Sequence, residues 1–317
     1  MSRWSLRLMA LALAAAAALA GVLVLAAYRR DMAAVAARLA ADGRTVETRA
    51  GRIEFASGGE GPALIVLHGA GGGHDQGRLI AAVFADCGFR WIAPSRFGYL
   101  GTPMPEDASV AAQAEALAAL LDHLGVHDAA VLAMSGGVPV ALQFAAGHPG
   151  RSRALALLSS APFTPMRARE QGLALPAGLY QLLFRSDFPF WLIAHAAPRL
   201  MERLFDVTPA IRARMGDSDR RFLSAMIDLF EPVSARAAGL ANEGAAIDPA
   251  ARYDLAAIAA PTLVVHARDD AINAFAIAQT IAGGIQGADL MALEEGGHLL
   301  IGHHAEVRQR VCRHLAR

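Results

Sequence analysis

The sequence predicts an α/β fold, in which a mostly parallel sheet carries helices on both faces and a helical lid is inserted between two strands. From residue 45 onward, short apolar runs alternate with segments of helical length, which is the pattern of a parallel sheet whose strands are joined by helices. Between about residues 162 and 250 the alternation stops, and the chain becomes helical and rich in phenylalanine. A chain of 317 residues has room for one large domain with such an insertion.

The predicted strands are short apolar runs. The run at residues 63–67 lies between Gly61-Pro62 and Gly69 and is entirely apolar, as expected of a strand that is covered on both faces. A hairpin is expected at residues 45–49 and 53–56, and further strands at residues 89–93, 129–133, 154–158, 262–266 and 289–293. Helical periodicity covers residues 77–86, 108–124 and 136–147.

Residues 1–30 are predicted to be a membrane anchor or a secretory signal. Residues 8–27 are uncharged and apolar over about the length that crosses a bilayer. A signal peptidase could cut after Ala18-Leu19-Ala20 and release an exported protein. The apolar run continues past that site, which favours the uncleaved anchor over both a signal and a buried core helix. Arginines at both ends leave the orientation undetermined, and residues 31–44 are expected to form a helical stalk.

The composition excludes several classes of function. The formal net charge is zero and no basic block is present, so nucleic acid is not expected as a partner. The chain has no lysine, which excludes Schiff-base chemistry. His303 and His304 lie near His298, but their spacing is not that of a metal site, and no metal is expected. Cys87 and Cys312 are expected to be buried free thiols, with a single bridge as the alternative if the domain is exported.

Residues 133–137, Ala-Met-Ser-Gly-Gly, follow an apolar run and precede a helical segment. A serine on a sharp strand-to-helix turn needs small residues two positions before and after it, because the backbone doubles back there. Ala133 and Gly137 occupy these positions. Such a turn exposes the Ser135 hydroxyl and directs the Gly136 amide into the same space, which gives a nucleophile and one oxyanion donor. Alone, the pattern also fits an ordinary serine between a strand and a helix.

A serine nucleophile needs a base, and the base needs an acid that orients it. The strand predicted at residues 262–266 is followed by two carboxylates, of which Asp270 is the favoured acid and Asp269 the runner-up. Two glycines after the last strand precede His298, which is the predicted base. The order Ser, Asp, His is the one that this architecture requires. Two further carboxylates are weaker alternatives because they precede a strand instead of following one: Asp248 and Asp254.

The second oxyanion donor is expected in the glycine-rich loop at residues 68–73. Glycines let backbone amides approach a developing negative charge closely. Ala70 is the favoured donor and Gly71 the next, and His68 is expected to order the loop through hydrogen bonds. A phosphate-binding loop is the competing interpretation, but no Gly-Lys-Ser/Thr follows.

In this order the segments resemble those of the α/β-hydrolase-fold serine hydrolases of the esterase and lipase type, with a helical cap. The resemblance covers residues 45–317 and rests on these segments: 68–72, 96–102, 134–137, 269–270 and 297–298. It implies hydrolysis through an acyl-enzyme without a cofactor, with Ser135, Asp270 and His298 as the triad and Ala70 and Gly136 as oxyanion donors. The expected division is a core of residues 45–161 and 251–317 and a cap of residues 162–250.

A serine at this turn fits hydrolysis of an ester, thioester, amide or carbon–carbon bond. The favoured substrate is a small ester-like molecule with an apolar group, because the predicted lid is rich in apolar residues. Met134 is expected at the substrate, and Arg96 either binds a substrate carboxylate or, in the favoured interpretation, braces the fold. The alternatives are a carbon–carbon hydrolase of a diketone-like acid and a slow-turnover ligand-binding member of the fold. The oligomeric state stays open.

Overall fold

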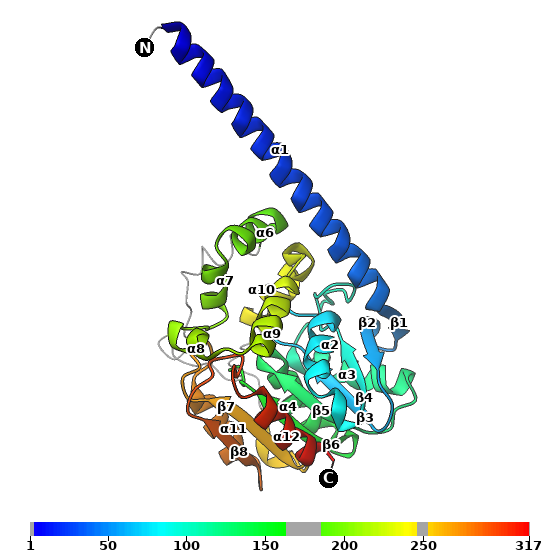
Figure 1. The fold of residues 1–317 in the computed structure, drawn as a ribbon. Coiled ribbons are helices and arrows are strands. Elements are labelled where there is room, and N and C mark those ends of the chain that lie inside the picture. The colour runs from blue at the N-terminus through cyan, green and yellow to red at the C-terminus, as the bar shows by residue number, and fades with distance from the viewer. Residues whose placement is uncertain (1–2, 163–184, 246–252, 317) are drawn as a thin grey trace. The chain divides into compact units, whose positions relative to one another are not determined.

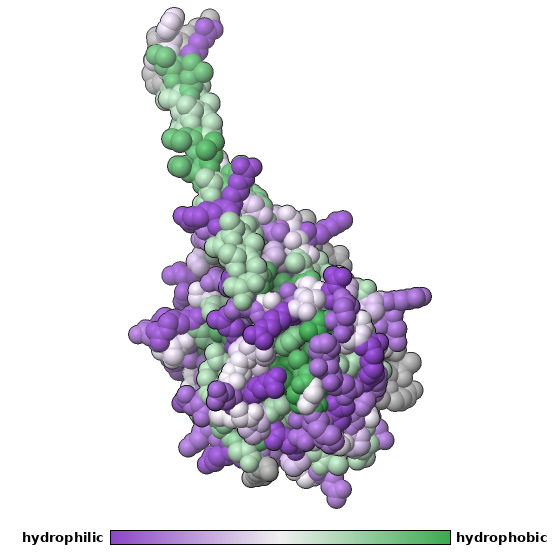
Figure 2. Space-filling view, turned by 90° about the vertical axis from the view of Figure 1, so that its right-hand side faces the viewer, coloured by the Kyte–Doolittle hydropathy of each residue, from purple (hydrophilic) through white to green (hydrophobic). Residues whose placement is uncertain are grey.

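The N-terminal part of the chain is one long helix. The computed structural model describes residues 3–162, 185–245 and 253–316, and the chain divides into residues 1–41 and residues 42–317. Helix α1 (Arg3–Asp42) runs without a break through the segments predicted as anchor and stalk. Its N-terminal half is exposed and mostly green, that is apolar, in Figure 2. Among the described residues it is the one helix that is long and apolar enough to cross a membrane.

The second part is built on one sheet of eight strands (Figure 1). The order across the sheet is β1-β2-β4-β3-β5-β6-β7-β8, in which β1 with β2 and β2 with β4 pair antiparallel and all other neighbours pair in parallel. The predicted α/β fold is confirmed, and each predicted strand forms within two residues of its expected ends. The strands are β1 (Arg44–Thr48), β2 (Gly51–Gly58), β3 (Ala63–Leu67), β4 (Arg90–Pro94), β5 (Ala129–Met134), β6 (Ser152–Leu158), β7 (Thr262–Ala267) and β8 (Asp289–Leu293).

Helices cover both faces of this sheet because alternate strand residues point to opposite sides and both sides are apolar. In β3, Leu64 and Val66 belong to one hydrophobic cluster, whereas Ile65 and Leu67 belong to the other. Helices α2 (His74–Val83) and α12 (His304–Leu315) pack in the first cluster, and α3 (Val110–His123), α4 (Val138–Gly147) and α11 (Phe275–Gly284) in the second. The predicted helices therefore form, although the segment predicted at 136–147 opens with a 3-10 turn, Ser135–Gly137.

Between β6 and β7 the described chain is helical, and Figure 1 shows these helices gathered at one end of the sheet. We call residues 185–245 the cap. Its apolar side chains, among them Phe190, Met201 and Phe230, belong to the same hydrophobic cluster as α2 and α12, so the cap shares its core with one face of the sheet. The predicted cap boundary at residue 250 lies outside the described residues. The cap elements are α6 (Asp187–Ala196), α7 (Pro198–Leu204), α8 (Pro209–Arg214), α9 (Asp217–Asp228), the 3-10 turn Val233–Arg236 and α10 (Ala237–Ala245).

Cys87 and Cys312 form a disulfide, so the prediction of two free thiols is wrong. Cys87 ends the short 3-10 turn that follows α2, and Cys312 lies in α12. Because α2 and α12 cover the same face of the sheet, the fold brings the two residues to a Cα–Cα distance of 5.3 Å. They are 225 residues apart in the sequence, and no local spacing could have predicted the pairing.

Candidate active site

Ser135 lies on a strained turn directly after β5. Its φ of 50° is in the left-handed region, which a residue other than glycine adopts only when its surroundings hold it there. A Cβ atom on Gly137 would lie 2.8 Å from the carbonyl oxygens of Leu67 and His68, so only glycine fits two positions after the serine. The turn thus packs tightly against the end of β3, and Ser135 lines a cavity at this edge of the sheet.

The Asp270 carboxylate, after β7, accepts hydrogen bonds at both of its oxygens. Oδ2 lies 2.9 Å from Nδ1 of His298 and 3.2 Å from Nε2 of His266, and Oδ1 accepts the backbone N–H groups of Ile272 and Asn273 at 2.9 and 2.8 Å. Burial raises the pKa of Asp270, but the His298 charge and these hydrogen bonds outweigh burial and hold the pKa far below its usual value. Asp270 is therefore an ionised acceptor for the histidine.

His298 lies in the loop after β8. Two carboxylates contact this loop: Asp270 at the imidazole and Asp269 at the preceding glycines. Burial lowers the pKa of His298, but the Asp270 carboxylate outweighs burial and raises it above its usual value. Because Nδ1 donates to Asp270, the lone pair of Nε2 is left for a proton from another group. Asp269 accepts the N–H groups of Gly297 at 2.9 Å and Gly296 at 3.3 Å. Asp269, the runner-up for the acid, thus binds the histidine loop and not the imidazole.

Ser135 and His298 line the same cavity, although no hydrogen bond joins them in the described part of the chain. Hydrogen bonds between catalytic groups are often long before a substrate binds. Nδ2 of Asn273 donates to Ser135 Oγ at 3.4 Å and to the Ser159 carbonyl at 2.9 Å. The Ser159 hydroxyl in turn donates to the His298 carbonyl at 2.7 Å. Asn273 and Ser159 therefore link the loops that carry the serine, the acid and the histidine.

The amides of the glycine-rich loop differ in what they bind. The Gly71 N–H donates to the Tyr99 hydroxyl at 3.3 Å, and the Gly69 N–H donates to Gln76 Oε1 at 2.8 Å. The Ala70 N–H has no hydrogen-bond partner among the described residues. A Cβ atom on Gly136 would lie 3.0 Å from the Ala70 nitrogen, so the two predicted oxyanion donors are neighbours across the turn. Gly71, the second choice for this role, already has a partner for its amide.

His68 orders the same loop. Its Nε2 accepts the Arg96 N–H at 3.0 Å, so its Nδ1 carries the proton and donates to the Gly69 carbonyl at 2.7 Å. Burial and the charge of Arg96 hold the pKa of His68 well below its usual value. A neutral histidine with both nitrogens engaged is the loop-ordering residue that the sequence predicts.

The cavity at Ser135 has a volume of about 120 Å³ and is lined mainly by apolar side chains. Met134, predicted at the substrate, is among its lining residues, as is Ala70. The core also contributes Ile272 and Leu299, and the cap contributes five large side chains to the lining: Met201, Leu204, Phe205, Met226 and Phe230. The site is thus formed between the carboxyl ends of the strands and the cap, where open α/β sheets bind ligands.

Comparison with known proteins identifies the family. Residues 62–305, more than half of the chain, match the alpha/beta hydrolase fold. The chain belongs to this family. A 2-hydroxymuconate semialdehyde hydrolase of Pseudomonas putida is 28% identical over 269 residues, which cover 83% of this chain and 90% of that protein.

A pimeloyl-[acyl-carrier protein] methyl ester esterase of Neisseria meningitidis is 31% identical over 215 residues, 66% of this chain and 76% of that protein. The solved structure of an alpha/beta hydrolase fold protein from Nakamurella multipartita matches with a TM-score of 0.70 at 30% identity, over 86% of this chain and 98% of that one. Similar members of the family thus include proteins named for ester cleavage and a hydrolase of a semialdehyde.

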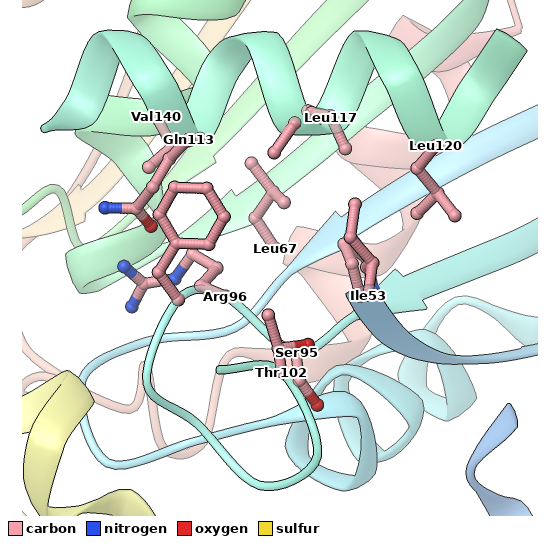
Figure 3. Close-up of a pocket in the computed structure, with 12 residues that line it drawn as sticks. Ile53, Leu67, Ser95, Arg96, Thr102, Gln113, Leu117, Leu120 and Val140 are labelled. Atoms are coloured by element: carbon pink, nitrogen blue, oxygen red, sulfur yellow. The ribbon is translucent and has the colours of Figure 1, made fainter. Parts of the chain in front are cut away.

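In this α/β-hydrolase, Arg96 does not line the cavity at Ser135. Its buried guanidinium donates to the Gly69 carbonyl at 3.3 Å and pairs with Glu243 of α10, which also accepts the Tyr99 hydroxyl at 2.8 Å. Figure 3 shows Arg96 beside Gln113 at a separate cavity of about 30 Å³ that is otherwise mostly apolar. These contacts agree with a bracing role and leave the guanidinium already paired.

Two further cap residues bind the core of this α/β-hydrolase beside the site. Arg236 is fully buried and pairs with both carboxylate oxygens of Asp75 at 2.7 and 3.2 Å. Asp206 Oδ2 accepts the backbone N–H groups of His298 and Ala271, each at 3.0 Å. Cap and catalytic loops are therefore joined by specific polar contacts as well as by apolar packing.

None of the remaining candidates that the structure describes lines the cavity at Ser135. Asp254 is exposed and caps the 3-10 turn Leu255–Ala257, and Asp248 lies outside the described residues. His303 and His304 are not among the residues that line this cavity, and within residues 3–162, 185–245 and 253–316 no group of three histidine, cysteine or acidic side chains could hold a metal ion.

Sequence reasoning missed the residues that hold the loops. Asn273, Ser159 and Asp206 belong to no motif, because their partners are backbone groups of distant segments. Gln76 binds the N–H of Gly69, seven residues before it. One signal was present: His266 interrupts an otherwise apolar strand four residues before Asp270. A buried polar side chain needs a partner, and Nε2 of His266 lies 2.9 Å from the Asn273 carbonyl oxygen and 3.2 Å from that carboxylate.

Proposed function

We propose that this α/β-hydrolase is a serine hydrolase that cleaves carboxylic esters through an acyl-enzyme on Ser135. The observation that carries the proposal is the set of contacts at the carboxyl edge of the sheet. Ser135 is held on a strained turn in a cavity with His298, and the imidazole is oriented by the buried Asp270 carboxylate at 2.9 Å. Nucleophile, base and orienting acid are the three roles that acyl transfer at serine needs.

The reaction follows from these roles. Ser135 Oγ attacks the ester carbonyl carbon while its proton passes to Nε2 of His298, and the carbonyl oxygen becomes an oxyanion that accepts the Ala70 and Gly136 N–H groups. The carbon–oxygen bond to the alcohol breaks as His298 returns the proton to the leaving oxygen. Water then attacks the acyl-enzyme with His298 as base, and the acid leaves Ser135. Asp270 holds the tautomer and stabilises the imidazolium in both halves.

The cavity supports an apolar substrate group. Met134 and the cap side chains Phe205 and Phe230 form much of its lining, and such a surface binds an acyl or alcohol group by excluding water from it. No cofactor enters this mechanism, because the serine, the histidine and the backbone amides supply the nucleophile, the base and the electrophilic donors.

Cleavage of a carbon–carbon bond in a diketone-like acid is the alternative chemistry, since one relative is a 2-hydroxymuconate semialdehyde hydrolase. That reaction would use a free cation for the substrate carboxylate. Arg96, the cation that this alternative would use, is paired with Glu243, which favours the ester. A slow-turnover ligand-binding protein is the third option, and sustained release of product would exclude it.

The test is labelling of the full chain, kept in detergent, with a fluorophosphonate probe. We expect the adduct on Ser135 by peptide mass spectrometry, and hydrolysis of aryl esters of short acids but not of diketone acids. Ser135→Ala should remove labelling and lower kcat by on the order of 10⁶-fold. Ser152→Ala is the matched control. Ser152 is also buried, but it is the first residue of β6, whereas the cavity lies at the carboxyl ends of the strands. A folded wild-type chain that is not labelled would refute the proposal.

We further propose that α1 anchors the protein in a membrane. The support is its length, its apolar composition and its exposure. The full chain should stay with membranes after alkaline carbonate washing and keep its first 30 residues, as terminal peptide mapping would show. A mature chain that begins after Ala20 would identify a secretory signal and refute the anchor.

A further inference from the structure

We propose that the cap residue Asp206 is a positioning residue of the Ser135 site, whose carboxylate ties the loop of the acid to the loop of the histidine and adds a second negative charge near the imidazole. This inference rests on the proposed serine hydrolase mechanism. It assigns the cap a part in arranging the catalytic groups, in addition to lining the cavity.

The contact joins two loops that come from different strands. One oxygen of Asp206, Oδ2, accepts the N–H of Ala271 and the N–H of His298, each at 3.0 Å. Ala271 directly follows Asp270 after β7, whereas His298 follows β8. A shared acceptor fixes these two backbone nitrogens relative to each other, and therefore helps to fix the distance between the Asp270 carboxylate and the imidazole.

Local geometry shows how closely the cap approaches here. Asp206 follows α7 with a φ of 64°, a left-handed conformation that aspartate and asparagine tolerate better than most residues. A Cβ atom on Gly297 would lie 2.9 Å from the Asp206 carbonyl oxygen and 3.0 Å from Oδ2. A glycine before His298 therefore leaves the space that the cap aspartate occupies, and Asp206 itself is only 7% exposed.

The charge of Asp206 acts on the histidine. Burial and the neighbouring Asp270 carboxylate raise the pKa of Asp206. Once ionised, Asp206 adds to the effect of Asp270 and raises the pKa of His298. The titratable and charged groups that surround His298 are Asp270 on Nδ1, Asp206 on the backbone N–H, His266 behind Asp270, Asp269 on the preceding glycines, and the exposed pair of Arg214 with Glu295.

If Asp206 only stabilised the fold, Asp206→Asn would leave the pH dependence of the site unchanged. If Asp206 is a positioning residue whose charge acts on His298, the same variant shifts that pH dependence. Asparagine keeps the acceptor oxygen and tolerates the left-handed φ, but it removes the charge. Asp206→Ala removes the acceptor as well. Asp219→Asn is the matched control, because Asp219 is also a cap aspartate that is 7% exposed and accepts a core N–H, that of Gly302 at 3.3 Å, but not the N–H of His298.

The experiment measures the rate of fluorophosphonate labelling of Ser135 as a function of pH in the full chain in detergent. Labelling needs a neutral His298, so its rate falls as pH falls through the pKa of that group. We expect Asp206→Asn to move this fall to lower pH and to keep the plateau, and Asp206→Ala to lower the plateau by on the order of 10- to 100-fold. Asp219→Asn should superimpose on the wild type.

An Asp206→Asn profile that superimposes on the wild type would overturn the inference, and so would an Asp206→Ala chain with an unchanged plateau. If Asp206→Ala fails to fold, the pH profile of Asp206→Asn still tests the inference by itself. Absence of labelling in the wild type is a separate result, since it contradicts the proposed serine mechanism before any variant is compared.

Discussion

The cap binds the core on two sides of the cavity, and the two contacts differ in kind. On the side of the oxyanion loop, the buried Arg236 guanidinium meets both oxygens of Asp75 and donates to the Gly72 carbonyl at 2.6 Å. On the side of the proposed triad, Asp206 accepts two backbone N–H groups at one carboxylate oxygen. The first contact pairs two opposite buried charges, and the second places a single charge against neutral amides.

Because the two contacts differ in kind, we expect one to matter more for stability and the other for the proposed reaction. Removing one member of a buried ion pair leaves the other charge without a partner and costs about 3–5 kcal/mol. Removing an acceptor of backbone N–H groups costs about 1–3 kcal/mol. The oxyanion side should therefore carry more of the folding free energy, whereas the triad side should carry more of the effect on His298, whose backbone and ring both meet a carboxylate.

The largest effect on stability is expected from Arg236→Met. The variant removes the guanidinium that meets both oxygens of the Asp75 carboxylate, which is 3% exposed. We expect the free energy of unfolding to fall by about 3–5 kcal/mol, measured by urea denaturation of the full chain in detergent.

The control is the double variant Arg236→Met with Asp75→Asn, which also removes the stranded charge. It should recover part of the loss, so the double-mutant cycle should give a favourable coupling between the two residues. A loss below about 1 kcal/mol for Arg236→Met, as for an exposed ion pair, would mean that the two sides of the cap do not differ as argued.

The sequence predicted the parts of the site that follow from the order of strands. Ser135 directly follows an apolar run, and Asp270 and His298 lie in the loops after two other apolar runs. Local rules apply at these places: small residues two positions before and after Ser135, and glycines before His298. The choice between Asp269 and Asp270 needed the structure, because adjacent residues on a loop point in different directions and only Asp270 contacts the imidazole.

The contacts of the cap could not be predicted in the same way. Asp206, Arg236 and Glu243 are charged residues in helices and turns of mixed composition, where the usual expectation is an exposed surface. Their partners in the core are 65 to 164 residues away in the chain. The same reason explains why the sequence favoured free thiols over the disulfide, since helix packing across a sheet face, and not local spacing, brings Cys87 and Cys312 together.

A smaller loss of stability is expected from Glu243→Gln. This variant tests the second ion pair that joins the cap to the side of the glycine-rich loop. Glu243 pairs with the buried Arg96, but its side chain is 20% exposed, so solvent screens part of the interaction. Glutamine keeps an oxygen that can accept the Tyr99 hydroxyl and loses only the charge. We expect unfolding free energy to fall by about 1–2 kcal/mol, less than for Arg236→Met.

Glu202→Gln is the matched control for this variant. Glu202 is 18% exposed and pairs with Arg212, but both residues belong to the cap and Arg212 is 37% exposed, so the loss should be below about 1 kcal/mol. Equal losses for the two glutamine variants would mean that Arg96 and Glu243 do not help to fix the cap to the oxyanion loop. A loss for Glu243→Gln as large as that for Arg236→Met would instead show that the two pairs act as one unit, since each holds a carbonyl of the same loop, Gly69 or Gly72, through its arginine.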